Sequence, residues 1–490
     1  MGSGLIRRPI FYLILALLYL NGSYRRPVAA AEKPAVTSAR YNGPGSCAAS
    51  ACHGGVQPVA VSATRKGIWQ NEYFIWASRD PHFGSFNSLQ TERSKRMAQI
   101  LQLKNPPASE PTCLICHALA PSAEHKARNF EPEGVSCESC HGASEAWFAN
   151  HFEKKWSTEQ SIQAGMYPID DVVKRSERCL DCHLGGADRE VDHKMIAAGH
   201  PDLFFELDLF SAKQPHHWKE PPQWKDYPGD ANYGVRLWAV GQAVQLREAL
   251  NRLARRADRA QSPDFQALGG QWPEFSELDC FGCHHSVNSN WREPGYGNQN
   301  SGPMVNAPNN WRQMRGYSDR TIGAPAWNSA HYTIFRIVLK EVDAADSQEL
   351  EARLSDLYQV TGKFNSSPKD VSDKAHSAGD LATRLVNTVN IAFDKTQLRR
   401  LLEQISAQGD RIANQDTRSA EQAYMALDSL FRCYDNKITP GGPLNTGVYP
   451  AIGKAIDELY HQFDDPSAYD APRFAAAMRK VNAALRAAGI

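Results

Sequence analysis

Residues 133–142 read Glu-Gly-Val-Ser-Cys-Glu-Ser-Cys-His-Gly, and the Cys-x-x-Cys-His element within them decides what fills the core of this chain. The element recurs at residues 113–117, 179–183 and 280–284, and a variant with four residues between its cysteines stands at 47–53. Two thiols three residues apart share one face of a helical turn, so they can form thioethers with the two vinyl groups of one porphyrin. The histidine that follows then lies beneath the ring and supplies an iron ligand. The pattern therefore predicts covalently bound haem c.

The five elements predict five haem groups, each attached through two cysteines and held on one side by a proximal histidine. The attachment residues are Cys47, Cys52, Cys113, Cys116, Cys137, Cys140, Cys179, Cys182, Cys280 and Cys283, and the proximal ligands are His53, His117, His141, His183 and His284. The first site has the unusual spacing, and a disulfide or a stray thiol pair is its alternative interpretation. Gly45, Gly54 and Gly55 around it favour a tight loop against a porphyrin.

Eleven further histidines are available as second axial ligands, and complete bis-histidine ligation needs five of them. The candidate distal ligands are His82, His151, His193, His200 and His217, with His216, His285 and His331 as alternatives. Methionine is a different possibility, at Met97, Met166 or Met195, and it would raise the reduction potential. For any single histidine, the competing interpretation is an ordinary surface or hydrogen-bonded residue.

The N-terminus predicts export. Arg7 and Arg8 precede an apolar run over residues 9–20, and small residues at 28–31 offer a cleavage site. This is the pattern of a secretory signal peptide over residues 1–31. The apolar run is too short for an ordinary transmembrane helix, which favours a cleaved signal peptide. The competing interpretation is that the segment is not cleaved and anchors the protein in the membrane. We expect a periplasmic protein with no integral membrane domain unless that segment is retained.

The charge balance argues against nucleic acid as a partner. The chain of 490 residues carries 54 basic and 54 acidic side chains. Residues 1–31 hold four arginines and no acid, so their removal leaves a formal net charge of minus four. An acidic protein binds nucleic acid poorly, and its charge suits a basic patch on a redox partner protein.

The spacing of apolar residues predicts a mainly α fold whose first part is irregular. Residues 32–330 form a pentahaem cytochrome c domain with few strands, in which the porphyrins replace the missing apolar core, and residues 291–327 form a wrapping loop. One amphipathic helix interrupts this region, with an apolar stripe over 239–257. Its other face, with Arg247, Glu248, Arg255 and Arg256, is predicted to be solvated.

Residues 340–490 predict an antiparallel bundle of four or five helices without a haem motif. The apolar stripes are Leu350, Leu354 and Leu357; Ala423, Leu427, Leu430 and Tyr434; Ile452, Ile456, Leu459 and Phe463; and Phe474, Met478, Val481 and Leu485. Ser419 and Gln422 predict a capping box at the start of the second stripe. Cys433, the cysteine outside the motifs, is predicted to be a quiet core thiol.

Several of these elements resemble one known family. They are Trp76, Ser78 and His82; residues 133–142 with Trp147 and His151; residues 197–201 with 205–207; and residues 280–285. Together they are similar to the multihaem c-type cytochromes related to the nitrifier tetrahaem cytochrome that accepts electrons from hydroxylamine oxidoreductase. The likeness covers roughly residues 43–330. It implies closely stacked haems, mostly bis-histidine, that relay electrons in the periplasm, whereas the fifth site and the C-terminal helices depart from the family.

Three functions compete on this sequence. The favoured one is a non-enzymatic electron carrier with filled haem irons. The second is an oxidoreductase of a small nitrogen or sulfur compound at one five-coordinate haem. Pentahaem nitrite reductases use Cys-x-x-Cys-Lys at the catalytic haem, and this chain has no such site. The third is a redox sensor in which the helical bundle binds a partner.

Overall fold

The computed structural model describes residues 39–59, 68–128, 130, 133–219, 232–267, 269–279, 327–438, 442–463 and 469–490. Arg40–Ile490 form one compact unit, and the other unit, Met1–Ala39, lies almost wholly outside the described residues, as does the predicted signal peptide. The predicted loop over 291–327 also lies outside them, apart from its last residue. No helix of the described parts is long and apolar enough to cross a membrane.

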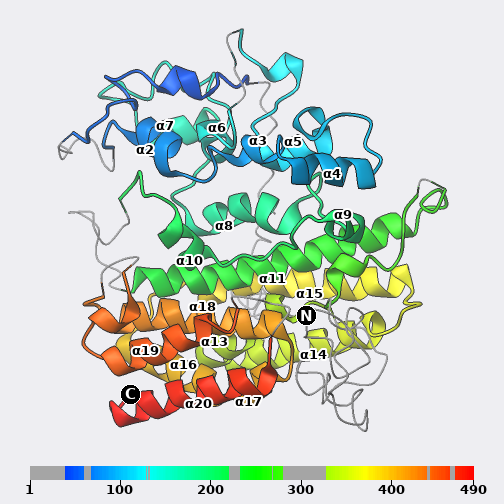
Figure 1. Cartoon of the computed structure of the whole chain (residues 1–490), viewed down its shortest axis with the longest axis vertical. Helices are drawn as coiled ribbons and strands as arrows, with labels where there is room; N and C mark the ends of the chain where they lie inside the picture. The colour runs from blue at the N-terminus through cyan, green and yellow to red at the C-terminus, as the bar shows by residue number, and fades with distance from the viewer. Residues whose placement is uncertain are drawn as a thin grey trace, which may run out of the picture. The chain divides into compact units, whose positions relative to one another are not determined.

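The described residues confirm the mainly α prediction. Extended backbone pairs only in two isolated bridges among them, between Tyr41 and Lys126 and between Leu278 and Trp327. The first part of the chain folds into short helices joined by irregular segments (Figure 1). These helices are α2 (Glu72–Arg79), α3 (Ser85–Ser88), α4 (Glu92–Ile100), α5 (Pro111–His117), α6 (Cys137–His141), α7 (Thr158–Gln163), α8 (Val172–Leu180), α9 (His193–Ala198) and α10 (Leu207–Lys213).

Side-chain caps explain where several of these short helices begin. Thr91, Ser157, Asp171 and Asp192 each accept a hydrogen bond from the backbone N–H three residues later, at the starts of α4, α7, α8 and α9. Such a cap satisfies a donor that the first helical turn leaves unpaired. Polar residues at fixed places therefore start helices that are too short to form by themselves.

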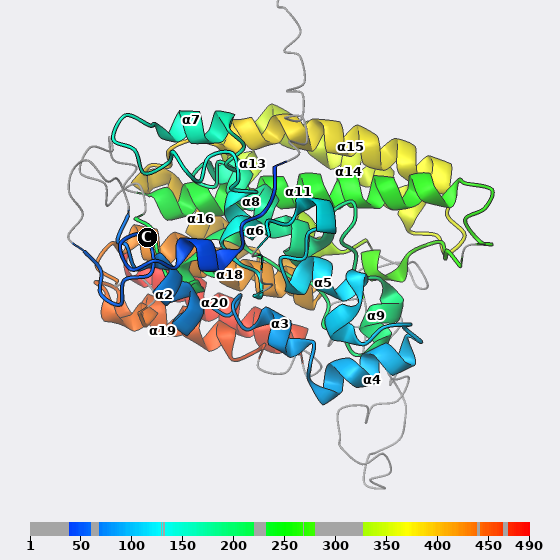
Figure 2. The same ribbon diagram turned by 90° about the horizontal axis from the view of Figure 1, so that it is seen from above.

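Helix α11 (Tyr233–Ala260) contains the predicted apolar stripe, and it is buried on nearly every side. It packs against α8 and α10 of the first part and against α15 and α18 of the C-terminal part. Ala239, Ala243, Leu246 and Leu250 are fully buried. The apolar stripe of α11 therefore faces packed helices from both parts of the chain. In Figure 2, α11 runs alongside α15, the helix of the C-terminal part against which it packs.

The prediction of a solvated charged face on α11 is wrong. The side chain of Arg256 is only 4% exposed and that of Arg247 is 12% exposed. Both arginines are paired with acids from other segments: Arg247 with Glu177 on α8, and Arg256 with Glu277. The sequence periodicity shows which face is charged, but it does not show whether acids from elsewhere cover that face.

The C-terminal helices follow the predicted stripes. They are α13 (Phe335–Val342), α14 (Ala344–Thr361), α15 (Pro368–Val389), α16 (Lys395–Ala407), α17 (Gly409–Ala413), α18 (Thr417–Tyr434), α19 (Pro450–Tyr460) and α20 (Ala471–Ala487). Leu354, Leu430, Ile456 and Met478 are among the buried members of the four stripes. Cys433 is partly buried against this core. The predicted capping box at Ser419 is wrong, because α18 begins earlier and Asp416 accepts the hydrogen bond from the backbone N–H of Ser419 at 2.7 Å.

One apolar core joins α11 to the C-terminal helices. It contains residues from Val172 on α8 through Leu250 on α11 to Ile490 at the end of the chain. The boundary near residue 340 stays a prediction, and the continuity of this core supplies a direct test of it.

Leu250→Ala on α11 and Leu459→Ala on α19 are each expected to lower the free energy of unfolding by about 2–5 kcal/mol, because each removes a fully buried side chain and leaves a cavity. Both variants should shift the same cooperative transition in calorimetry of the full-length protein. Two separate transitions, one sensitive to each variant, would instead establish residues 340–490 as an independent domain.

Candidate functional site

The cysteine motifs lie on short helical turns. Residues 113–117 end α5, and residues 137–141 make up the whole of α6. Cys179 lies in the last turn of α8, and Cys182 and His183 lie in the π-helical turn that follows it, Asp181–Gly185. Cys47 ends a 3-10 turn, Pro44–Cys47. Cys280, Cys283 and His284 of the fifth motif lie outside the described residues.

Three pairs of histidine rings face one another at nearly the same distance. The ring centroids are 6.2 Å apart for His53 and His151, 6.1 Å for His82 and His183, and 6.3 Å for His117 and His200. Each pair joins a motif histidine to a predicted distal candidate. Two imidazoles bonded to opposite sides of one metal ion, at about 2 Å each, have centroids about 6 Å apart. The three gaps therefore fit one haem iron each.

The outer nitrogens of five of these rings make hydrogen bonds that orient them. Nδ1 of His53 bonds to Glu72 Oε2 at 3.0 Å, His82 to Asp80 Oδ1 at 2.9 Å, His117 to the Ser85 carbonyl at 3.1 Å, His151 to the Phe148 carbonyl at 2.7 Å, and His200 to the Pro201 carbonyl at 2.7 Å. Carboxylates and carbonyls only accept hydrogen bonds, so each Nδ1 must carry the proton. In a neutral ring of this tautomer, the lone pair of Nε2 is the one available to a metal.

The histidine of the third motif lies near another predicted distal candidate. Burial, together with the nearby His217 and His53, lowers the pKa of His141 to about 4. The candidate His217 therefore lies near His141. His216 has another role, because its Nε2 donates to the Ser211 carbonyl at 3.1 Å.

His193 lies beside the segment that leads into the fifth motif. Its backbone N–H donates to Glu274 Oε1 at 2.9 Å, and its ring lies edge-on to Phe275 with centroids 5.6 Å apart. Whether it faces His284 stays a prediction, because His284 lies outside the described residues.

Contacts between thiols show which motifs are neighbours. A hydrogen bond with Cys137 lowers the pKa of Cys47, and one with Cys116 lowers the pKa of Cys182 to about 7. Burial and the nearby Cys140 thiol together raise the pKa of Cys179 to about 12. The first motif therefore adjoins the third, the third adjoins the fourth, and the fourth adjoins the second. No disulfide joins any of the described cysteines, Cys47 and Cys52 included.

A buried carboxylate ties the first site to the third motif. Glu138, inside the third motif, accepts hydrogen bonds from the backbone N–H groups of Asn42 at 3.0 Å, Gly43 at 2.7 Å and Ser144 at 2.8 Å. The loop that leads to Cys47 is thereby fixed against α6. This role was not predicted from the sequence, although a carboxylate between the two cysteines of a motif is a visible signal.

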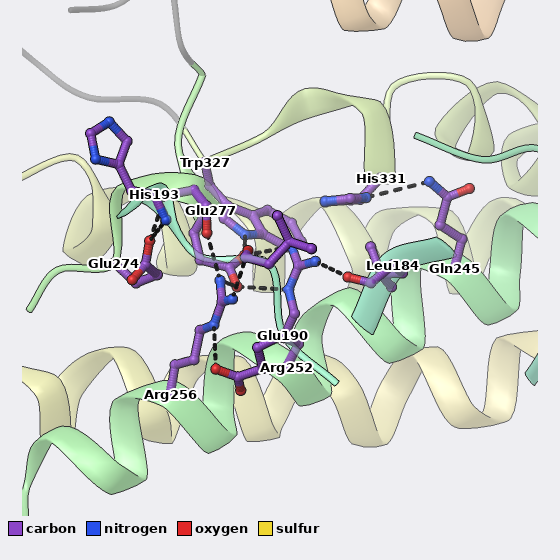
Figure 3. Close-up of polar contacts among 12 residues, drawn as sticks. Leu184, Glu190, His193, Gln245, Arg252, Arg256, Glu274, Glu277, Trp327 and His331 are labelled. Atoms are coloured by element: carbon purple, nitrogen blue, oxygen red, sulfur yellow. Dashed lines mark hydrogen bonds and ion pairs between the residues drawn. The ribbon is translucent and has the colours of Figure 1, made fainter. Parts of the chain in front are cut away.

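A buried ion cluster joins the fourth motif to the approach to the fifth (Figure 3). Arg252 of α11 donates two hydrogen bonds to the carboxylate of Glu277, at 2.8 and 3.0 Å, and a third at 2.5 Å to the carbonyl of Leu184, next to His183. Arg256 donates to the same carboxylate at 2.7 Å. Trp327 Nε1 donates to it as well, at 3.3 Å. No local sequence pattern points to this cluster, because its members come from distant segments.

His331 lies beside this cluster, fully enclosed by protein. Burial, with the charge of Arg252, lowers its pKa to about 3, so the imidazole is neutral. Its Nδ1 is 3.5 Å from Gln245 Nε2, and its Nε2 has no hydrogen-bond partner among the described residues.

Helix α18 of the C-terminal part contacts the loop that carries His200. Arg418 pairs with Asp202, two residues after His200. Gln422 Nε2 donates to the Phe205 carbonyl at 3.2 Å, and the Phe205 ring stacks on His183 with centroids 5.2 Å apart. The C-terminal helices therefore help to position the histidines of two sites.

Comparison with protein families gives one match. Residues 48–142 match the family described as cytochrome c554 and c-prime. A search of curated proteins and a search of solved structures each gave no match. The matched stretch contains Cys52 and His53 of the first site and the whole second and third motifs. The match supports a c-type cytochrome with covalently bound haem c and a role in electron transfer, a class of protein that is typically exported.

Proposed function

We propose that this chain is a periplasmic multihaem cytochrome that transfers electrons through about five covalently bound, mostly bis-histidine haems. The observation that carries the proposal is the set of three histidine pairs with centroids 6.1, 6.2 and 6.3 Å apart. Each pair unites a histidine of a cysteine motif with a histidine far away in sequence. Hydrogen bonding alone gives no reason for three such pairs to share one spacing, whereas an iron between each pair does.

The ligand assignment follows from the pairs. His53 and His151 would hold the first iron, His117 and His200 the second, and His183 and His82 the fourth. His141 would hold the third from one side, with nearby His217 as its candidate partner. For the fifth, with proximal His284, we propose His193 as the distal ligand. Filling both axial positions keeps small molecules off the irons, as a carrier requires.

The neighbouring thiols support a continuous path. The contacts give the order first, third, fourth and second for the attachment sites. Haem groups would supply reversible one-electron chemistry at each site. The chain's own contribution is to hold the sites in this order, fix the ligand rings through Nδ1, and exclude water with residues such as Phe205.

The proposed partners are other redox proteins of the periplasm. The formal net charge of the chain without residues 1–31 is minus four, which suits steering toward a basic patch. The likeness to the cytochromes related to the nitrifier electron acceptor supports the same kind of partner, and nothing in the charge suits nucleic acid.

Intact mass and electron paramagnetic resonance test the proposal together. The mass of the exported protein should exceed that of the cleaved polypeptide by five haem groups, and the ferric spectrum should be low-spin throughout. An excess of four haems would remove the site at Cys47 and Cys52, and an absence of covalent haem would refute the proposal. A high-spin signal from one site would favour the alternative, an oxidoreductase acting on a small nitrogen or sulfur compound.

A further inference from the structure

Two of the paired histidines differ from the others in the charge of their outer partner. The Nδ1 of His53 donates to the Glu72 carboxylate at 3.0 Å, and the Nδ1 of His82 donates to the Asp80 carboxylate at 2.9 Å. Both carboxylates are shielded from solvent, with side chains 13% and 1% exposed. These are charged hydrogen bonds in a setting of low polarity, where they act strongly.

Other contacts hold the two carboxylates in place. Glu72 also accepts hydrogen bonds from the backbone N–H of Trp69 at 2.5 Å and of Gln70 at 3.2 Å. Asp80 accepts from the backbone N–H of His82 at 2.9 Å and from Gln214 Nε2 at 3.1 Å. The carboxylates are therefore built into the fold and do not simply swing in from the surface.

The pair that would serve the second site has only neutral partners. The Nδ1 of His117 meets the Ser85 carbonyl at 3.1 Å and the Ser88 hydroxyl at 3.0 Å, and that of His200 meets the Pro201 carbonyl at 2.7 Å. Its ring planes cross at 87°, almost the same as the 85° between His82 and His183. The second and fourth sites therefore match in ring geometry and differ in the charge behind one ligand.

A carboxylate behind an axial imidazole makes the ring a stronger base. A more basic ligand stabilises the ferric iron, which has the greater positive charge, over the ferrous iron. The reduction potential of that site falls as a result, since hydrogen bonding and nearby charge are among the protein's means of setting it.

We propose that Glu72 and Asp80 are potential-setting residues that hold the first and fourth haem sites at lower reduction potentials than the second. They act through His53 and His82, as positioning residues that do not touch the iron. The first and second sites lie at opposite ends of the order given by the thiol contacts. The two ends of this order of four sites therefore differ in reduction potential. Of the first, second and fourth sites, the second is reduced first. This inference rests on the proposed function.

Glu72→Gln and Asp80→Asn test it, because each removes the charge and keeps nearly the same shape. Each variant should keep all its haems and its low-spin spectrum. In a spectroelectrochemical titration, each should raise the potential of one haem, a different one in each variant, by at least a tenfold change in its reduction equilibrium, which is about 59 mV for one electron. Asp171→Asn is the control: this carboxylate caps α8 by accepting from the backbone N–H of Lys174 at 2.9 Å, and it should shift no potential.

Unchanged potentials in haem-loaded variants would overturn the inference and leave the proposed function intact, whereas missing haem in the unmodified protein would remove the function itself. A second measurement applies even if a variant folds poorly. In the unmodified protein, the low-spin component that disappears in His200→Ala should have a higher potential than those that disappear in His151→Ala and His82→Ala. The reverse order would also overturn the inference.

Discussion

Replacing Glu277 by glutamine is expected to lower the free energy of unfolding by about 3–5 kcal/mol, the cost of removing one partner from a buried ion cluster. The carboxylate is 3% exposed and receives hydrogen bonds from Arg252 and Arg256, at 2.8 and 2.7 Å. In the variant, both guanidinium groups stay buried on α11 without their counter-charge. Denaturant unfolding followed by circular dichroism at neutral pH measures the loss.

The effect should depend on pH in a defined direction. Burial alone raises the pKa of Glu277, but Arg252 and Arg256 outweigh burial and lower the pKa to about 2. A folded-state pKa below the ordinary value of about 4.3 means that the stabilisation is complete above that value and is lost as the pH falls toward the folded-state pKa. The advantage of the unmodified protein over the variant should therefore shrink between about pH 4.5 and pH 2.

Asp373→Asn provides the matched control. Asp373 forms an exposed ion pair with Lys369 on α15, with side chains 59% and 69% exposed. Exposed pairs contribute little to stability, so this change should leave the unfolding curve nearly unaltered. Equal effects of the two substitutions, or a loss at Glu277 that does not change with pH, would contradict the assignment of the cluster as a structural anchor.

His82→Ala, His151→Ala and His200→Ala are each expected to change one iron from low-spin to high-spin. In the proposed function the cysteines attach the haems through thioether bonds, so intact mass should show no loss of haem from any variant. An iron without its sixth ligand should also begin to bind cyanide or nitric oxide, and its potential should move because the axial ligand is a main determinant. Electron paramagnetic resonance of the ferric proteins measures the change directly.

His125→Ala is the control for this series, since His125 faces no motif histidine among the described residues and its Nδ1 is 2.8 Å from the Ser122 hydroxyl. Its spectrum should match that of the unmodified protein. If a variant of the series also kept the unmodified spectrum, its histidine would return to an ordinary structural role and the pair would lose its assignment as one haem site.

Much of the fold could be predicted because helix formation here follows local patterns. The stripes that contain Leu354, Leu430, Ile456 and Met478 turn inward as their spacing of three and four residues predicts. The caps were less predictable: Ser419 and Gln422 fit the sequence pattern of a capping box, yet α18 starts at Thr417 and Asp416 is its cap. Several polar residues near a helix start can serve as the cap, and tertiary packing selects one.

The candidate site divides in the same way. His82, His151 and His200 could be selected from the sequence by their setting, but nothing local indicates that they face His183, His53 and His117 respectively. The sequence also gave no reason to pair Arg252 with Glu277 or to place Glu72 and Asp80 behind two ligand rings. Each of these contacts depends on how separate turns pack.

The sequence by itself predicted the haem chemistry, the proximal histidines and the helical stripes, because two cysteines and a histidine within one turn, or apolar residues at helical spacing, act over a few residues. The tertiary structure alone decided which distant histidine faces the first, second and fourth motifs, which of the described motifs are neighbours, and which charges of α11 are buried. These features depend on contacts such as His53 with His151 and Arg252 with Glu277, which form only when segments far apart in the chain pack around one core.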